Sequence, residues 1–263
     1  MAHPGHELRV LDWVAHARPM ACILTDGSGS EGVPRIGLTQ RSFEQCGIQA
    51  GPILGEMSDR QMYAYLLAQD ASIFFSIRDR LCDWLVDNRI DVLVSDGMEG
   101  YNPTHDLCHA LASAAVGQAR IRGVAVAHWC IPLIGDPRRF ADGASPIVHE
   151  SVLDAGALAR KMAAIRAYAA DSGSTLQSEV DQIIRMYGAD AFGHERFFDA
   201  AAPSWLEWRA GFRAEKPYYE RYGRAQVAAG RYDHVISFDD QVGPLIDTLF
   251  GAECAPAAAG AAA

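Results

Sequence analysis

The 263-residue chain lacks several patterns that would assign it to a specialised class of protein. Its six cysteines form no Cys-x-x-Cys pair, and several lie in apolar segments, which predicts reduced thiols packed in a core. No apolar stretch approaches the roughly 20 residues needed to span a bilayer. No charged segment with an apolar core precedes a cleavage site, so we expect a cytoplasmic protein without a membrane span.

Positive charge is also scarce. The formal net charge is -10, and lysine and arginine are dispersed without a basic run. Nucleic acids and anionic membranes are therefore poor partners, because their binding depends on clustered positive charge. With 49% hydrophobic and 21% charged residues, the composition is that of an ordinary soluble globular protein. The length fits one large domain, or a domain with a C-terminal extension.

Short apolar segments alternate with longer amphipathic ones. Apolar runs predict buried strands at residues 20–25, 90–95 and 123–128. Helical spacing of apolar residues predicts helices at residues 7–19, 39–48, 60–69, 73–89, 104–119, 154–170, 174–188, 216–230 and 241–250. This alternation favours an α/β fold with a mostly parallel sheet and helices on both faces.

One strand is absent from this pattern. A parallel α/β domain normally has a strand immediately before a loop such as "AHPGHE", yet only Met1 precedes it. We expect either that the true start lies upstream or that a central strand has been lost. Without that strand, His3 and His6 would be poorly anchored.

Histidines occur in loops that should meet at one edge of the sheet. In open α/β sheets, ligands bind beyond the carboxyl ends of the strands. The opening loop carries His3 and His6, and the loop after residues 90–95 leads to His105. Three such imidazoles with an open fourth position are the arrangement of catalytic zinc. Spacing alone is equally compatible with a solvated chain end, and His109, one turn after His105, is expected to be a packed helix residue.

Eight motifs follow one another along the chain. The first is "AHPGHE", and after it come "LTDG", "RSFEQCGI", "ILGEMSD", "IDVLVS", "GYNPTHD", "KMAAIRAYAADSG" and "GHERFF". This ordered set resembles the PIG-L-type (LmbE-like) zinc-dependent N-acetylglucosaminyl deacetylase family, because "AHPGHE" is similar to the family's "AHPDDE" and "GYNPTHD" is similar to its Gly-Tyr-x-His-Pro-Asp-His signature. The resemblance implies a Rossmann-like domain over residues 1–200. Residues 201–250 are then a helical extension packed on it, and the Ala-rich residues 251–263 are expected to be disordered.

The resemblance also implies roles for particular residues. His3 and His105 match histidine ligands of zinc, and His6 stands where the family has an aspartate ligand. Gly5 stands where the family has its general-base aspartate. Asn102 stands where the family has a histidine that helps to polarise the substrate carbonyl.

Two features offset the absence of a base at Gly5. Three neutral ligands leave more positive charge on zinc, which lowers the pKa of its water towards about 7. A carboxylate from elsewhere is the other solution, and Asp96 and Asp26 follow two predicted strands, although both also suit tight turns. The Asn102 amide suits an oxyanion. Glu7 is expected to cap the first helical turn.

Two further positions match substrate-binding residues of the family. Arg41 and Glu44 fit its Arg-x-x-Glu helix, in which the arginine contacts substrate, and Asp59 fits a position that hydrogen-bonds a sugar hydroxyl. Each is also compatible with an ordinary surface charge or a helix N-cap.

The leading hypothesis is a divergent hydrolase that uses zinc, or another divalent metal, to cleave an N-acyl bond of a small polar metabolite such as an N-acyl amino sugar or glycoconjugate. The alternative is a non-catalytic or reaction-switched relative that binds a metabolite in the same crevice, because of Gly5 and Asn102. The Trp, Tyr and Arg side chains of residues 201–250 suit packing of the extension, a substrate pocket or a homo-oligomer interface.

Overall fold

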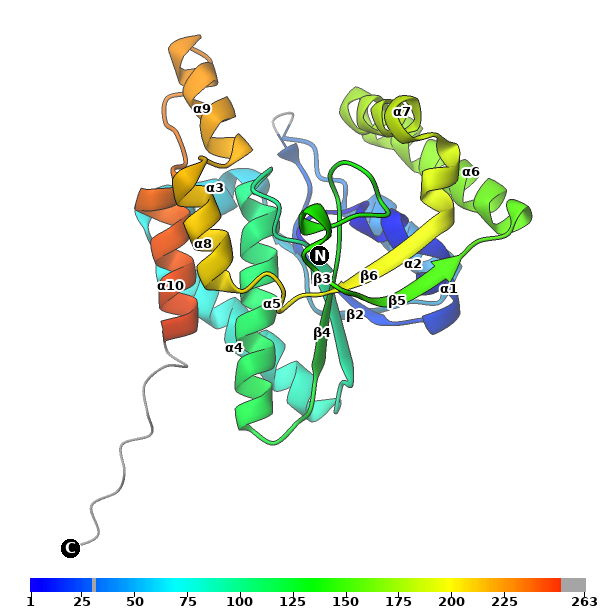
Figure 1. Ribbon diagram of the computed structural model, residues 1–263, viewed down its shortest axis with the longest axis horizontal. Coiled ribbons are helices and arrows are strands. Elements are labelled where there is room, and N and C mark those ends of the chain that lie inside the picture. The colour runs from blue at the N-terminus through cyan, green and yellow to red at the C-terminus, as the bar shows by residue number, and fades with distance from the viewer. Residues whose placement is uncertain (30–31, 252–263) are drawn as a thin grey trace, which may run out of the picture.

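The computed structural model describes residues 1–29 and 32–251, which form an α/β structure (Figure 1). The predicted disordered tail lies, from residue 252 onward, outside the described residues. None of the described helices is both long and apolar enough to cross a membrane. The five described cysteines are free thiols, and three of them are buried.

The described strands form two sheets rather than one. β1 (Met20–Thr25) and β2 (Gln49–Met57) make a parallel pair, and the second sheet has the order β3-β4-β6-β5. In it, β3 (Val92–Asp96) and β4 (Ala127–Ile131) are parallel, whereas β6 (His194–Asp199) runs antiparallel to both β4 and β5 (Ile147–Val152). The α/β class is confirmed, and the strands form one parallel pair and one mixed sheet rather than a single, mostly parallel sheet.

The sequence placed one strand too early and missed others. The strand predicted at 123–128 lies at 127–131, because Val124 N–H and the Val126 carbonyl bond to Ala119 and Arg120 and close the end of a helix instead. β2 was missed because it contains Gly51, Pro52 and Gly55, residues that rarely occur inside strands. β5 and β6 are rich in polar side chains and lack an apolar run.

Helices occupy the segments expected, with one addition at α8. The main helices are α1 (Leu11–Ala17), α2 (Ile36–Cys46), α3 (Asp59–Ala68), α4 (Ala71–Asp87), α5 (Pro103–Ile121), α6 (Ala155–Ser172), α7 (Ser174–Tyr187), α8 (Trp205–Ala214), α9 (Tyr218–Ala228) and α10 (Gly243–Gly251). Single helical turns are η1 (His6–Val10), η3 (Ala141–Gly143), η4 (Ala189–Gly193) and η5 (Phe238–Val242).

Two groups of helices cover the strands (Figure 1). α4 and α5 share one apolar core with the C-terminal helices, in which Leu85, Leu107 and Leu249 are fully buried. α1 and α2 pack with Ile23 and Phe197 on the other side of the strands. The C-terminal helices therefore complete the core over α4 and α5 rather than stand apart from it.

Candidate metal centre

The first two residues run beside β1. The Met1 amino group donates to the Cys22 carbonyl at 2.9 Å, and Leu24 N–H donates back to the Met1 carbonyl at 2.9 Å. Thr25 N–H then donates to the Ala2 carbonyl at 3.0 Å. These backbone hydrogen bonds fix the position from which His3 projects.

His3 is buried against two polar partners. Its Nδ1 lies 2.7 Å from Thr25 Oγ1 and 3.1 Å from Asp59 Oδ1, whereas its buried Nε2 has no partner among the described residues. Asp59 also accepts the Gly29 N–H at 2.6 Å through its other oxygen. Burial alone would raise the pKa of Asp59, but the hydrogen bond and charge of His3 hold that pKa below its usual value. One ring nitrogen of His3 is therefore oriented and the other is free.

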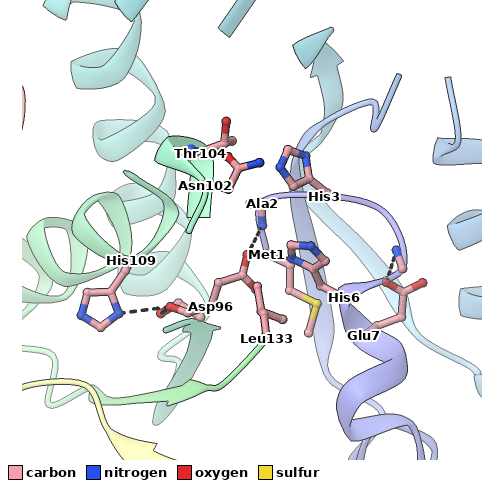
Figure 2. A network of polar contacts seen from close by, with 12 residues as sticks. Met1, Ala2, His3, His6, Glu7, Asp96, Asn102, Thr104, His109 and Leu133 are labelled. Atoms are coloured by element: carbon pink, nitrogen blue, oxygen red, sulfur yellow. Dashed lines mark hydrogen bonds and ion pairs between the residues drawn. The ribbon is translucent and has the colours of Figure 1, made fainter. Parts of the chain in front are cut away.

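His6 is oriented by a second buried carboxylate. Its Nδ1 lies 2.9 Å from Asp96 Oδ2, which also accepts the Ala2 N–H at 2.6 Å (Figure 2). Asp96 ends β3 and is fully buried. Burial would raise its pKa, but the contact with His6 holds the pKa of Asp96 well below its usual value. Burial lowers the pKa of His6, so the neutral ring that a metal ligand requires is favoured.

His105 comes from the first turn of α5. Asn102 caps this helix by accepting the Thr104 N–H at 2.8 Å, and Pro103 occupies the first position, where its missing N–H costs nothing. His105 is buried, and its Nδ1 has no partner among the described residues. Burial lowers the pKa of His105 well below its usual value, which favours the neutral imidazole here too.

The three rings form a compact cluster. Their centroids are 4.7 Å apart for His6 and His105, 5.1 Å for His3 and His105, and 5.3 Å for His3 and His6. Three imidazoles on one tetrahedral ion, with Zn–N bonds of about 2.0–2.1 Å, place their centroids about 5 Å apart. A carboxylate on the rear nitrogen of a histidine is also the usual support of a ligating ring. The residue types, spacing and supporting carboxylates thus fit a zinc ion.

The donor atoms of the three histidines do not meet at one metal position in the structure. Within residues 1–29 and 32–251, no group of three or more His, Cys, Asp or Glu side chains is arranged to hold a metal ion as it stands. The ring centroids are spaced as a shared ion would place them, but the donor atoms are not. Binding would therefore require the three side chains to shift so that one nitrogen of each reaches a common centre.

The space at Gly5 is already filled. Gly5 has φ of +99°, and a Cβ added there would lie 3.1 Å from Cε1 of Tyr168. Its N–H is shared between Glu7 Oε2 at 2.8 Å and Thr39 Oγ1 at 3.1 Å, and Thr39 contacts the Tyr168 hydroxyl at 3.0 Å. Glu7, which was expected to cap the first helical turn, thus accepts the N–H of Gly5, the residue that precedes η1. No side chain at position 5 would fit without strain.

Two other predicted site residues lie in ordinary structural roles. Asp26 Oδ1 accepts the Ser28 N–H at 2.9 Å, as in a tight turn. The Arg41 side chain is 59% exposed and pairs at 3.6 Å with the exposed Asp171, and Glu44 is exposed on the same helix. The structure does not bring Arg41 or Asp26 into contact with the histidine cluster.

His109 packs as expected for a helix residue outside the cluster. Its Nδ1 lies 3.1 Å from the Asp96 carbonyl, and its Nε2 lies 3.2 Å from the Ala200 carbonyl. Figure 2 shows His109 on the far side of Asp96 from His3.

Sequence reasoning missed a carboxylate near the cluster. Glu179 of α7 lies within electrostatic range of His3, Arg35 and Arg9. Desolvation by the surrounding protein raises the pKa of its carboxyl, although the residue as a whole is exposed. None of the described residues forms a hydrogen bond or an ion pair with it. No sequence signal distinguishes Glu179 from other charges on an amphipathic helix. Tyr168, by contrast, lies in the quoted "KMAAIRAYAADSG" motif and could have been found there.

A buried ion pair holds the segment that carries His6. Lys161 Nζ lies 2.7 Å from Glu195 Oε1, and both side chains are almost free of solvent. Lys161 also donates to the Arg9 carbonyl, and Glu195 accepts the N–H groups of Asp12 and Trp13 at the start of α1. Two quoted motifs, "KMAAIRAYAADSG" and "GHERFF", therefore meet behind η1.

Comparison with known proteins gives no relative for this chain: no family model, no curated protein and no solved structure matches it.

Proposed function

We propose that this protein is a metal-dependent hydrolase that cleaves the N-acyl bond of a small polar, sugar-containing metabolite, on a Rossmann-like fold of the PIG-L type. The observation that carries the proposal is the cluster of His3, His6 and His105, with ring centroids 4.7–5.3 Å apart. These three residues would hold zinc, although such a ligand set also accepts other divalent ions.

Two carboxylates prepare the ligands in this proposal. Asp59 and Asp96 hold the rear nitrogens of His3 and His6, which orients the rings and increases their basicity. Burial lowers the pKa of His6 and of His105, which favours their neutral form. When bound, zinc would polarise the substrate carbonyl and lower the pKa of water to near neutrality.

Glu179 best suits the role of proton acceptor. Asp59 and Asp96 are each tied to a histidine and to a backbone N–H, and Glu7 is tied to Gly5 and Thr39. Glu179 has no such partner among the described residues, and its raised pKa brings it closer to the working range of a general base.

Asn102 suits stabilisation of the oxyanion. Its Oδ1 is committed to the Thr104 N–H, so its amide nitrogen is left to donate. Figure 2 shows Asn102 and Thr104 opposite His3. A carbonyl bound at the cluster would have an amide donor from this side.

An aromatic surface beside the site suits a sugar ring. Tyr101, next to Asn102, stacks on Tyr218 with centroids 4.9 Å apart, and Tyr218 contacts Tyr222 at 5.8 Å. Tyr218 and Tyr222 are 44% and 43% exposed. Such rings offer apolar area with a polar tip, which matches the mixed surface of a carbohydrate.

The test is release of amine from N-acetylglucosamine and simple N-acetylglucosaminides by zinc-loaded protein. We expect Glu179→Gln to lower kcat by about 10²–10⁴-fold with a small change in KM, the usual cost of losing a general base. Glu44→Gln, on an exposed site of α2, is the matched control and should leave turnover unchanged. Turnover that is equal in wild type and in His105→Ala would contradict the proposal.

One observation favours a second candidate function, metabolite binding without hydrolysis. The Tyr168 ring fills the space beside Gly5 where the resembled family has its base. Zinc binding that is lost in His105→Ala, together with sugar binding and no amine release from any N-acetyl sugar, would favour this candidate.

A further inference from the structure

An apolar slot separates the two sheets. One wall is the edge of β1 at residues 20–24, and the other is the edge of β3 at residues 92–95. The slot has a volume of about 340 Å³, and its lining is mainly apolar. Met1 lies at one end of it.

Helices close both faces of the slot. On one face, Cys22 and Leu93 point into the core of α4 and α5, where Trp84 and Leu111 line the slot. On the other face, Ile23 and Val94 point into the core of α1 and α2, where Trp13 and Phe43 line it. The side chains of both edges thus alternate between two covered faces, as they do for the central strands of a sheet between helix layers.

Apart from the bonds that Met1 and Ala2 make to residues 22–25, both edges have backbone hydrogen bonds on one side only. β1 pairs with β2, and β3 pairs with β4, but no backbone hydrogen bond of the described residues joins β1 to β3. Unpaired N–H and C=O groups along a strand edge are a template for another strand. Here two such edges face the same slot.

Met1 and Ala2 already pair as the end of a strand in this position. Met1 donates to the Cys22 carbonyl and accepts from the Leu24 N–H, which is the pattern of a parallel ladder with Ile23 as its partner. On the opposite side, Ala2 N–H donates to Asp96 at the end of β3. Residues before Met1 in the same ladder would lie along residues 20–22, inside the slot.

We propose that the slot accepts one parallel β-strand of about five apolar residues, joined to the amino end of Met1, which unites the two sheets into one. The order of strands would then be β2, β1, the inserted strand, β3, β4, β6 and β5. Its side chains must be apolar on both faces, because helices cover both. A peptide N–H at Met1 would also keep the bond to Cys22 without placing a charged amino group there.

The proposal does not depend on metal binding, and its test is structural. The chain is made with Val-Leu-Val-Val-Leu fused before Met1, with Ser-Gly-Ser-Gly-Ser fused there as the matched control, and without an extension. Amide hydrogen exchange at residues 20–22 and 92–95 is compared among the three. We expect exchange to slow by about tenfold or more with the apolar extension and to stay unchanged with the polar one.

Thiol labelling of the protein at low concentration is a second measure of whether the slot is occupied. Cys22 lines the slot, whereas Cys46 on α2 does not. We expect the apolar extension to slow maleimide labelling of Cys22 about tenfold and to leave Cys46 unchanged. Equal exchange and labelling rates in all three proteins would overturn the proposal. So would protection by both extensions alike, because it would show that an apolar strand is not required.

Discussion

The carboxylate of Asp96 links the end of β3 to the opening loop, ninety residues away in sequence, through a 2.9 Å contact with His6 Nδ1. The same oxygen accepts the Ala2 N–H at 2.6 Å. One buried carboxylate thus positions both the backbone before His3 and the ring of His6. The histidine cluster depends on this residue for its shape, although Asp96 itself is not one of the three rings.

Replacement of Asp96 by asparagine should therefore weaken metal binding. Asp96→Asn keeps the size of the side chain but removes the charge that orients His6, and such supporting residues typically contribute 10–100-fold in metal affinity. Zinc titration with a competing chelator measures the change. The control, Asp171→Asn on the exposed surface, should bind like wild type. Equal affinity for both variants would show that Asp96 does not support the ligand.

A side chain at position 5 should destabilise the protein. Gly5 has φ of +99°, and a Cβ there would press on Tyr168 at 3.1 Å. We expect Gly5→Ala to lower the free energy of unfolding by about 1–3 kcal/mol, measured by urea denaturation. Gly37→Ala is the control, because nothing lies within 4 Å of its Cβ position. An unchanged unfolding midpoint for Gly5→Ala would show that a side chain at position 5 does not clash with Tyr168.

Glu99 should make stability depend on pH. Burial raises its pKa from 4.5 to about 8, while the N–H groups of Leu133 and Ile134 bond to it. A raised pKa means that the folded state holds the proton more tightly than the unfolded state. The contribution of protonated Glu99 to the free energy of unfolding is thus complete below pH 4.5 and is lost as pH rises through about 8.

The Glu99→Gln variant isolates that effect. Glutamine keeps an acceptor for both N–H groups but does not ionise. Relative to wild type, the variant should gain stability between pH 5 and pH 9, by up to about 1.4 kcal/mol per pH unit within the titration range. Urea denaturation at several pH values measures it. A constant difference between the two proteins across this range would contradict a buried, titrating Glu99.

Replacement of only one member of the buried Lys161–Glu195 ion pair should lower the free energy of unfolding. Lys161→Met leaves the Glu195 carboxylate buried without its 2.7 Å partner, and loss of one member of a buried pair typically costs about 3–5 kcal/mol. Lys161→Met with Glu195→Gln removes the stranded charge and should recover part of the loss, since glutamine still accepts a backbone N–H. Chemical denaturation compares them. A double variant less stable than Lys161→Met would contradict this view.

The sequence predicted the parts of the fold that repeat simple patterns. The apolar run at 20–25 is a strand, and the amphipathic segments are helices, because burial of one face determines both. It did not predict β6, because pairing partners for a polar strand come from distant segments. The cluster followed from loops at strand ends, where the structure places His3, His6 and His105 together.

The surroundings of Arg41, Tyr168 and Glu179 could not be predicted from the sequence, for one physical reason. Arg41 matches a motif yet is 59% exposed. Tyr168 reaches Gly5, and Glu179 comes within electrostatic range of His3, only because α6 and α7 fold back over the opening loop. The directions of these side chains depend on how the helices pack. That packing cannot be predicted from the spacing of residues along the chain.

The most direct test of the account is the zinc content of the purified protein after incubation with zinc and removal of excess ion. Wild type should retain about one ion per chain, His105→Ala should lose it, and His16→Ala, which changes an exposed histidine outside the cluster, should retain it. Wild type that retains no zinc, or His105→Ala that retains as much as wild type, would contradict the assignment of the cluster as a metal centre.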